Sequence, residues 1–189
     1  MRYEEFTIEG RNAVIEAYRA GRPIDKLFIL DGCQDGPILT IKREAKAKQT
    51  PVKFVTKERL DQLSETGKHQ GVIAYAAAYE YATVEEILDN ARQKGEAPFL
   101  FLLDNIEDPH NLGAIIRTAN LAGAHGVIVP KNRAAGLTAV VAKTSAGALN
   151  FTPVARVTNL AKTIEELKKE GIWFVCADMG GTTMYDLNL

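Results

Sequence analysis

Cysteine is scarce in this sequence: among 189 residues there are only Cys33 and Cys176, whose separation fits neither a metal site nor a redox pair. We therefore expect two reduced thiols in a cytoplasmic protein. The three histidines, at positions 69, 110 and 125, also lack metal-ligand spacing, so no metal site is predicted. No apolar run approaches the length of a membrane span, and the first residues, MRYEE, contain no apolar signal region. We expect no membrane contact.

Net charge is nearly absent as well, because 23 Lys and Arg residues face 24 Asp and Glu residues, giving −1. The protein therefore has no overall positive charge that would indicate nucleic-acid binding, although a local basic patch is compatible with this balance. A glycine-rich phosphate turn is also missing, which argues against an ordinary dinucleotide enzyme. What is present is a globular composition, with 46% hydrophobic and 25% charged residues. The length suits one large or two small domains.

The most informative stretch runs from Phe99 to Pro130. The apolar run 99–103, followed by a polar loop, predicts a strand buried on both faces. Asn111 is then the predicted N-cap of a helix that ends near Gly123, and residues 126–130 predict the next strand. This βαβ unit gathers its polar residues where such sheets bind ligands. The helix should bury the stripe Leu112, Ile115, Ile116 and Ala119.

The segment 104–119, DNIEDPHNLGAIIRTA, closely resembles the first motif of the SpoU (TrmH) family. These proteins are S-adenosylmethionine-dependent RNA 2′-O-ribose methyltransferases of the SPOUT class. The resemblance implies that Arg117 and Asn111 are catalytic. Because a guanidinium stays protonated, Arg117 should anchor a phosphate and stabilise charge on the 2′-oxygen rather than act as a base. Two alternatives stay open: Arg117 as a surface residue paired with Glu107 or Asp108, and Asn111 as a helix cap only.

Residues 1–78 alternate helical and strand patterns and predict a small α/β module. The segments GRNAV at 10–14 and HQGV at 69–72 are similar to the family's N-terminal RNA-binding module, whose fold is like that of ribosomal protein L30e. The alternative to RNA binding is that Arg11 and Asn12 belong to a solvent-exposed helix start and that His69 and Gln70 form an ordinary turn. Amide and guanidinium groups suit base edges, 2′-hydroxyls and phosphates. The resemblance therefore implies RNA contacts at Arg11, Asn12, His69 and Gln70.

Residues 79–97 are predicted to be a linker containing one short helix, and residues 98–189 a mainly parallel α/β domain of the SPOUT type. In this domain we expect a helix over 136–149, a helix over 160–170 capped by Thr158 or Asn159, and a fully buried strand over 172–177. Three basic residues in family-like segments are placed to hold a substrate backbone: Lys131, Arg133 and Lys143.

In the family, a glycine-rich loop and a Ser-Leu-Asn segment follow this domain and form the trefoil knot, most of the S-adenosylmethionine pocket and much of the dimer contact. Neither occurs before Leu189, so we expect a chain truncated before them, with the family's pocket residues beyond Leu189. No cofactor-binding residue is therefore assigned. The resemblance implies S-adenosylmethionine as cofactor, a guanosine of 23S ribosomal RNA as substrate, and a homodimer in the full-length form. The alternative is a catalytically incompetent RNA-binding fragment or module.

Overall fold

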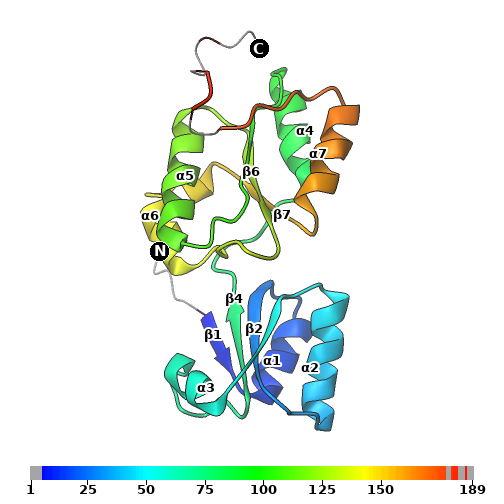
Figure 1. Ribbon diagram of the computed structural model, residues 1–189, viewed down its shortest axis with the longest axis vertical. Coiled ribbons are helices and arrows are strands. Elements are labelled where there is room, and N and C mark those ends of the chain that lie inside the picture. Colours follow the sequence, from blue (N-terminus) through cyan, green and yellow to red (C-terminus); the bar gives the residue numbers. More distant parts are fainter. Residues whose placement is uncertain (1–5, 178–179, 183–185, 187–189) are drawn as a thin grey trace.

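The chain is organised around a four-stranded mixed sheet and a three-stranded parallel sheet, each with helices on both faces (Figure 1). This computed structural model describes residues 6–177, 180–182 and 186. The α/β class predicted from the sequence is confirmed, as is the mainly parallel second sheet. The first sheet is mixed.

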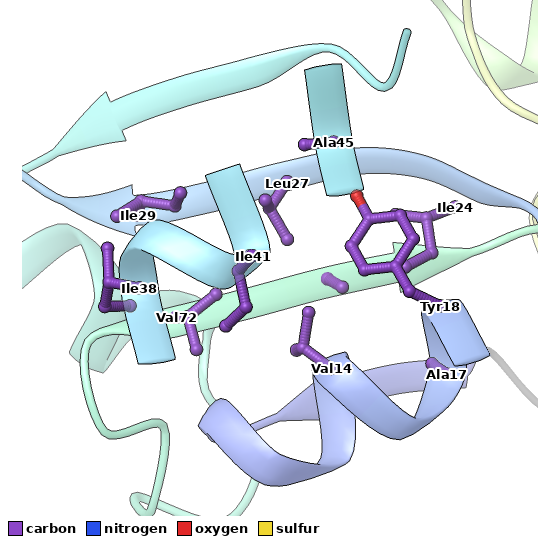
Figure 2. Close-up of a cluster of buried hydrophobic side chains, with 11 residues drawn as sticks. Val14, Ala17, Tyr18, Ile24, Leu27, Ile29, Ile38, Ile41, Ala45 and Val72 are labelled. Carbon is purple, nitrogen blue, oxygen red and sulfur yellow. The ribbon is translucent and has the colours of Figure 1, made fainter. Parts of the chain in front are cut away.

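The first sheet has the strand order β1-β4-β2-β3, with β4 antiparallel to both of its neighbours. Helices α1 and α2 cover one face and α3 covers the other (Figure 1). Figure 2 shows the larger of the two cores, in which Val14 and Ile41 from the helices pack against Leu27 from the sheet. The elements are β1 (Phe6–Glu9), α1 (Arg11–Arg19), β2 (Ile24–Leu30), α2 (Gly36–Ala47), β3 (Val52–Val55), α3 (Lys57–Leu63) and β4 (Val72–Ala76).

The second sheet has the order β5-β6-β7 and is parallel throughout. Helices α5 and α6 pack on one face, and α4 and α7 pack on the other (Figure 1). The central strand β6 is the most buried, because it has a neighbour on each side and a layer on each face. The elements are α4 (Val84–Lys94), β5 (Leu100–Leu102), α5 (Pro109–Leu121), β6 (Gly126–Pro130), α6 (Ala139–Thr144), the 3₁₀ turn η1 (Ala148–Asn150), β7 (Val154–Val157) and α7 (Leu160–Lys169).

Two strand predictions need correction. Strand β5 is only half-buried rather than buried on both faces, because it lies at the edge of its sheet. Residues 172–177 were expected to form a fully buried strand but belong to no strand. Trp173 is 92% exposed, whereas Ile172 and Phe174 pack partly against the core that lies between the second sheet and helices α4 and α7. An apolar run becomes a buried strand only where a neighbouring strand offers hydrogen bonds and both faces are covered.

The helix predicted over 136–149 is shorter in the structure. It begins after Thr138, whose hydroxyl accepts a hydrogen bond from the Val141 N–H at 3.4 Å. It ends at Thr144, because Ala146 and then Gly147 adopt positive φ values of 50° and 90°, which lie outside the right-handed helical region. By contrast, Asn159 caps α7 as one of the two predicted candidates, accepting from the Lys162 N–H at 2.9 Å.

The segment predicted to be a linker contains helix α4, which packs on the second sheet, on the face that it shares with α7. In α4, Ile87, Leu88 and Ala91 are at most 2% exposed and lie against the same sheet face as Leu167 of α7. Gly126 of β6 fits beneath Ile87, and a Cβ added there would lie only 2.6 Å from its side chain. Residues 84–94 are thus a packed layer of the second sheet as well as a connection between the two sheets.

A bulge in β2 turns Asp25 toward the second sheet. The pairing of β2 with β4 shifts register between Ile24 and Lys26, and the intervening Asp25 is 7% exposed. Its Oδ1 accepts hydrogen bonds from Arg156 Nη1 of β7 at 2.7 Å and from the Tyr81 hydroxyl at 2.6 Å. Arg156 Nη2 also donates to the Asp25 carbonyl at 2.8 Å. The buried pair therefore joins the two sheets directly.

The surroundings of Asp25 are closely packed. Gly136 lies against its carboxylate, and a Cβ at that position would collide with it. The Leu137 N–H donates to the Tyr81 hydroxyl at 3.1 Å, which ties the loop before α6 to the same node. Burial raises the pKa of Asp25, and the guanidinium of Arg156 opposes that rise. Arg156 is thus the strongest of the interactions that oppose the effect of burial on the pKa of Asp25.

Replacing Arg156 with Met should lower the free energy of unfolding by roughly 3–5 kcal/mol, because Asp25 would stay buried without its cation. Urea denaturation followed by circular dichroism measures this loss. Arg92→Met is the control: the Arg92 side chain is 53% exposed and pairs with three surface carboxylates, so its loss should cost less than about 1 kcal/mol. Equal losses in the two variants would contradict a special role for the buried pair.

Candidate functional site

Helix α5 carries the two residues that the motif predicts to be catalytic. Asp108, and not Asn111, is its N-cap, because the Asp108 carboxylate accepts from the His110 N–H at 2.9 Å and Pro109 takes the first helical position. The prediction that Asn111 caps the helix is therefore wrong. Asn111 lies in the first turn with its side chain exposed, which leaves its amide available for another partner.

The buried stripe of α5 is close to the predicted one. Leu112, Ile116 and Ala119 are fully buried, while Ile115 is half-buried. Gly113 is also buried, because α6 crosses α5 at this point and a Cβ on Gly113 would collide with the Thr144 side chain. The glycine therefore sets the close approach of the two helices.

Arg117 is exposed on α5, and among the residues that the structure describes it has neither an ion pair nor a hydrogen bond from its side chain. The alternative pairing with Glu107 or Asp108 is not formed there. Arg117 and Asn111 are six residues apart, which places them about 9 Å apart along the helix axis and about 120° apart around it. The helix thus presents the two side chains on different faces.

The carboxyl ends of β6 and β7 lie toward the first sheet. Lys131 Nζ donates to Gln49 Oε1 at 2.8 Å, and the Thr158 hydroxyl donates to the same oxygen at 2.7 Å. Arg133 is exposed in the loop after β6, where its φ is 56°, and Lys143 is exposed on α6. Of the three predicted backbone-binding cations, Lys131 is thus already engaged at the seam between the sheets.

In the first sheet, the structure brings two of the predicted RNA contacts together. The Arg11 backbone N–H donates to Gln70 Oε1 at 3.2 Å, and Arg11 Nε donates to the Gln70 carbonyl at 3.0 Å. Arg11 Nη2 also pairs with Asp35 at 2.7 Å. Asn12 is exposed beside them in the first turn of α1. Arg11 and Gln70 therefore form one hydrogen-bonded unit, with Asn12 at its margin.

His69 is placed differently from the prediction, since it is only 6% exposed. Its Nε2 lies 2.9 Å from Asp61 Oδ1, and its Nδ1 accepts from the Gly71 N–H at 3.0 Å. With both ring nitrogens occupied and the ring enclosed, His69 does not present a surface to RNA. It fixes the turn in which Gln70 adopts a positive φ of 51°.

Sequence reasoning missed Glu9, which holds the loop preceding this turn. Its carboxylate accepts from the Ser64 and Thr66 hydroxyls, each at 2.6 Å, and from the N–H groups of Glu65 and Thr66 at 2.6 and 3.2 Å. Burial alone would raise the pKa of Glu9, but these hydrogen bonds outweigh it and lower the pKa to about 2. No local signal reveals this role, because the partners are more than fifty residues away.

The cofactor pocket of the family was predicted to lie beyond Leu189, so no residue of this chain was assigned to it. Leu189 itself lies outside the described residues, which end at position 186. The prediction about Leu189 and the pocket therefore stays a prediction, and the structure gives it no geometry.

Within residues 6–177, 180–182 and 186, every helix is too short or too polar to span a membrane. Nor do these residues contain a group of three His, Cys, Asp or Glu residues arranged to hold a metal ion.

Comparison with known proteins assigns both parts of the chain. Residues 7–82 match the family described as RNA 2′-O ribose methyltransferase substrate binding, and residues 98–189 match the SpoU rRNA methylase family. The Bacillus subtilis protein YacO, assigned to the TrmH family of tRNA/rRNA methyltransferases, is 48% identical over 169 residues, covering 89% of this chain and 68% of YacO. A TrmH-family protein from Staphylococcus epidermidis is 44% identical, covering 96% of this chain and 73% of that protein. The chain belongs to the SpoU (TrmH) family of RNA methyltransferases.

Among solved structures, the AdoMet-bound rRNA methyltransferase of Sinorhizobium meliloti is 25% identical with a TM-score of 0.40, covering 87% of this chain and 58% of that one. The AdoMet complex of the SpoU methyltransferase AviRb from Streptomyces viridochromogenes is 21% identical with a TM-score of 0.42, covering 88% of this chain and 59% of that one. The chain thus spans less than two thirds of the length of these two structures.

Glu9→Gln should destabilise the protein near neutral pH, because a neutral amide cannot accept the same four hydrogen bonds. The folded pKa of Glu9 lies below its ordinary value, so its contribution is present above about pH 4.5 and is lost as the pH falls toward 2. The difference between variant and wild type in free energy of unfolding, measured by urea denaturation, should therefore shrink from about pH 7 to about pH 3. Glu16→Gln, on the exposed face of α1, is the control. A pH-independent difference would refute the role.

Proposed function

We propose that the protein containing this chain transfers a methyl group from S-adenosylmethionine to the 2′-hydroxyl of a ribose in RNA. The observation that carries this proposal is the succession of a substrate-binding region over 7–82 and a methylase region over 98–189 in one chain. The motif resemblance adds a guanosine of 23S ribosomal RNA as the target, a cytoplasmic location and a homodimer. The same proposal includes a first domain that ends at residue 78, a second domain that begins at residue 98, and a cofactor pocket formed by residues beyond Leu189.

Arg117 is the proposed catalytic residue, and Asn111, six residues earlier on α5, is proposed to act with it. An exposed guanidinium without a competing carboxylate among the described residues is available to a phosphate next to the target ribose. From that position it stabilises negative charge as the 2′-hydroxyl loses its proton. Asn111, freed from capping by Asp108, supplies an amide that both donates and accepts hydrogen bonds to the nucleotide.

The remaining polar contacts are proposed to bind the RNA strand. Arg11, Asn12 and Gln70 form the recognition surface of the first sheet, and His69 orders the turn beneath it. Arg133 and Lys143 provide exposed cations for the phosphate backbone in the second. Lys131 contributes from the seam between the sheets.

S-adenosylmethionine supplies an electrophilic methyl group on sulfur. A cavity of about 520 Å³ lies beside Gly171, Ile172, Trp173, Phe174 and Lys168. Its side chains offer aromatic surface and one ammonium group, so acceptors for the ribose hydroxyls and the amino group of the donor would come from main-chain carbonyls. No step of the reaction is assigned to these residues.

With no donor-binding residue assigned in the described part of the chain, the second candidate function is RNA binding without catalysis. Isothermal calorimetry of S-adenosylmethionine with the 189-residue chain separates the two. One-site binding supports methyl transfer by this chain. Failure to bind, in a folded chain that still retains RNA, supports the binding module.

The reaction itself is tested by incubating the complete protein with ribosomal RNA and methyl-labelled S-adenosylmethionine. Label should appear in nucleotides that resist alkaline cleavage, because a 2′-O-methyl group removes the hydroxyl that attacks the neighbouring phosphate. Label confined to the bases would overturn the proposal.

Arg117→Ala in the complete protein should lower turnover by at least about 100-fold, because the developing oxyanion loses its charged partner. Circular dichroism should be unchanged, since the side chain is exposed. Arg117→Lys should recover only part of the activity, because an ammonium lacks the bidentate geometry of a guanidinium. Arg92→Ala is the matched surface control. Turnover of Arg117→Ala equal to that of this control would remove Arg117 from the mechanism.

A further inference from the structure

A cavity of about 380 Å³ lies between the first sheet and helix α6. Thr7 of β1, Tyr75 of β4 and Gln62 of α3 line it on one side, and Thr138 and Ala139 line it on the other. Its volume falls within the range of small-molecule sites. None of these residues was singled out from the sequence, because the cavity forms only when the two sheets are brought together.

The lining of this cavity suits a nucleobase. Tyr75 contributes an aromatic ring, which packs edge-on against Phe28 at a centroid distance of 5.3 Å. Gln62 Oε1 already accepts from Arg59 Nη1 at 3.0 Å, so Gln62 offers its amide N–H groups as donors, and the Glu65 carboxylate at the cavity accepts from the Thr7 hydroxyl at 2.8 Å. Proteins recognise unpaired RNA bases by stacking on aromatic rings and by hydrogen bonds to base edges.

Two lysines lie on the same sheet face as the cavity residues Thr7 and Tyr75. Thr7, Tyr75 and Lys26 are directly paired across β1, β4 and β2, so their side chains share a face. Lys53 of β3 is paired with Phe28, which lies on that face beside Tyr75. Strand pairing therefore connects the cavity residue Tyr75 with the ammonium groups of Lys26 and Lys53 on the same face.

Carboxylates also lie near this face in the part of the chain that the structure describes, among them Glu65 at the cavity itself. Asp25 is already paired with Arg156 at 2.7 Å, and Glu107 in the loop before α5 acts on Lys26 from the other sheet. Burial lowers the pKa of Lys26, and the like charge of Lys53 lowers it further. An added anion would relieve this repulsion.

We propose that the cavity and the two lysines form a subsite for one unpaired nucleotide of the RNA, with the base between Tyr75 and α6 and the phosphate on Lys26 and Lys53. The inference rests on the proposed function, since it takes RNA as the partner. It places a nucleotide at the seam between the sheets, apart from Arg117. A strand bound there would bridge the recognition module and the methylase region.

The test is binding of a fluorescent single-stranded oligouridylate to the 189-residue chain, measured by anisotropy over a series of salt concentrations. Lys26→Gln and Lys53→Gln should each weaken binding and reduce the slope of log affinity against log salt by about 0.7, the value for one single-strand phosphate contact. Lys162→Gln, an exposed lysine of α7, is the matched control and should leave the slope unchanged.

The cavity is tested separately by Gln62→Trp, which fills it from an exposed helix position. Affinity should fall at least about fivefold at every salt concentration with an unchanged slope, because a base contact and not a charge is lost. Gln93→Trp, on the exposed face of α4, is the control. Thermal unfolding of each variant checks the fold, and the two lysine variants carry the test if Gln62→Trp does not fold.

The outcomes separate this inference from the proposed function. Absence of RNA binding by the wild-type chain would overturn the RNA partner itself, and the subsite with it. RNA binding by the wild type with unchanged slopes in both lysine variants would overturn the subsite alone. Equal losses in the controls would do the same. Binding of free uridine monophosphate as tightly as the oligonucleotide would overturn the assignment to an RNA strand.

Discussion

The buried pair of Asp25 and Arg156 is the interaction on which the relation of the two sheets depends. A bulge in β2 places the Asp25 carboxylate against Arg156 of β7, and Gly136 leaves the space that the carboxylate needs. Breaking such a pair leaves a buried charge, so the paired arrangement is favoured over a separated one. The orientation that results brings the carboxyl ends of β6 and β7 against the first sheet.

The proposed recognition surface at Arg11, Asn12 and Gln70 is held in place by residues that lie beneath it. His69 and Asp61 fix the turn at Gln70, and Glu9 gathers four donors from the loop before it. A turn with a non-glycine residue at positive φ persists only where its surroundings enforce it. The proposed RNA surface at Arg11 and Gln70 is thus preorganised from beneath, which reduces the conformational entropy lost on binding.

The same orientation brings the two proposed RNA-binding regions together at the contact between the sheets. The cavity beside Tyr75 exists only between the sheets, and Lys26 lies near the Glu107 loop that leads into α5. A nucleotide at the seam would therefore be held by side chains from one sheet within reach of the loop that precedes Arg117. Neither module alone provides this surface.

Local patterns in the sequence determined the α/β class, most of the buried stripe of α5, the cap at Asn159 as one of two candidates, and the motif that indicates the family. These follow from helical spacing and nearby hydrogen bonds, which a short stretch contains in full. Tertiary structure decided the exposure of Trp173, the burial of His69 and the seam at Asp25. Each depends on whether a distant segment supplies a strand, a covering layer or an opposite charge, and no local pattern contains that information.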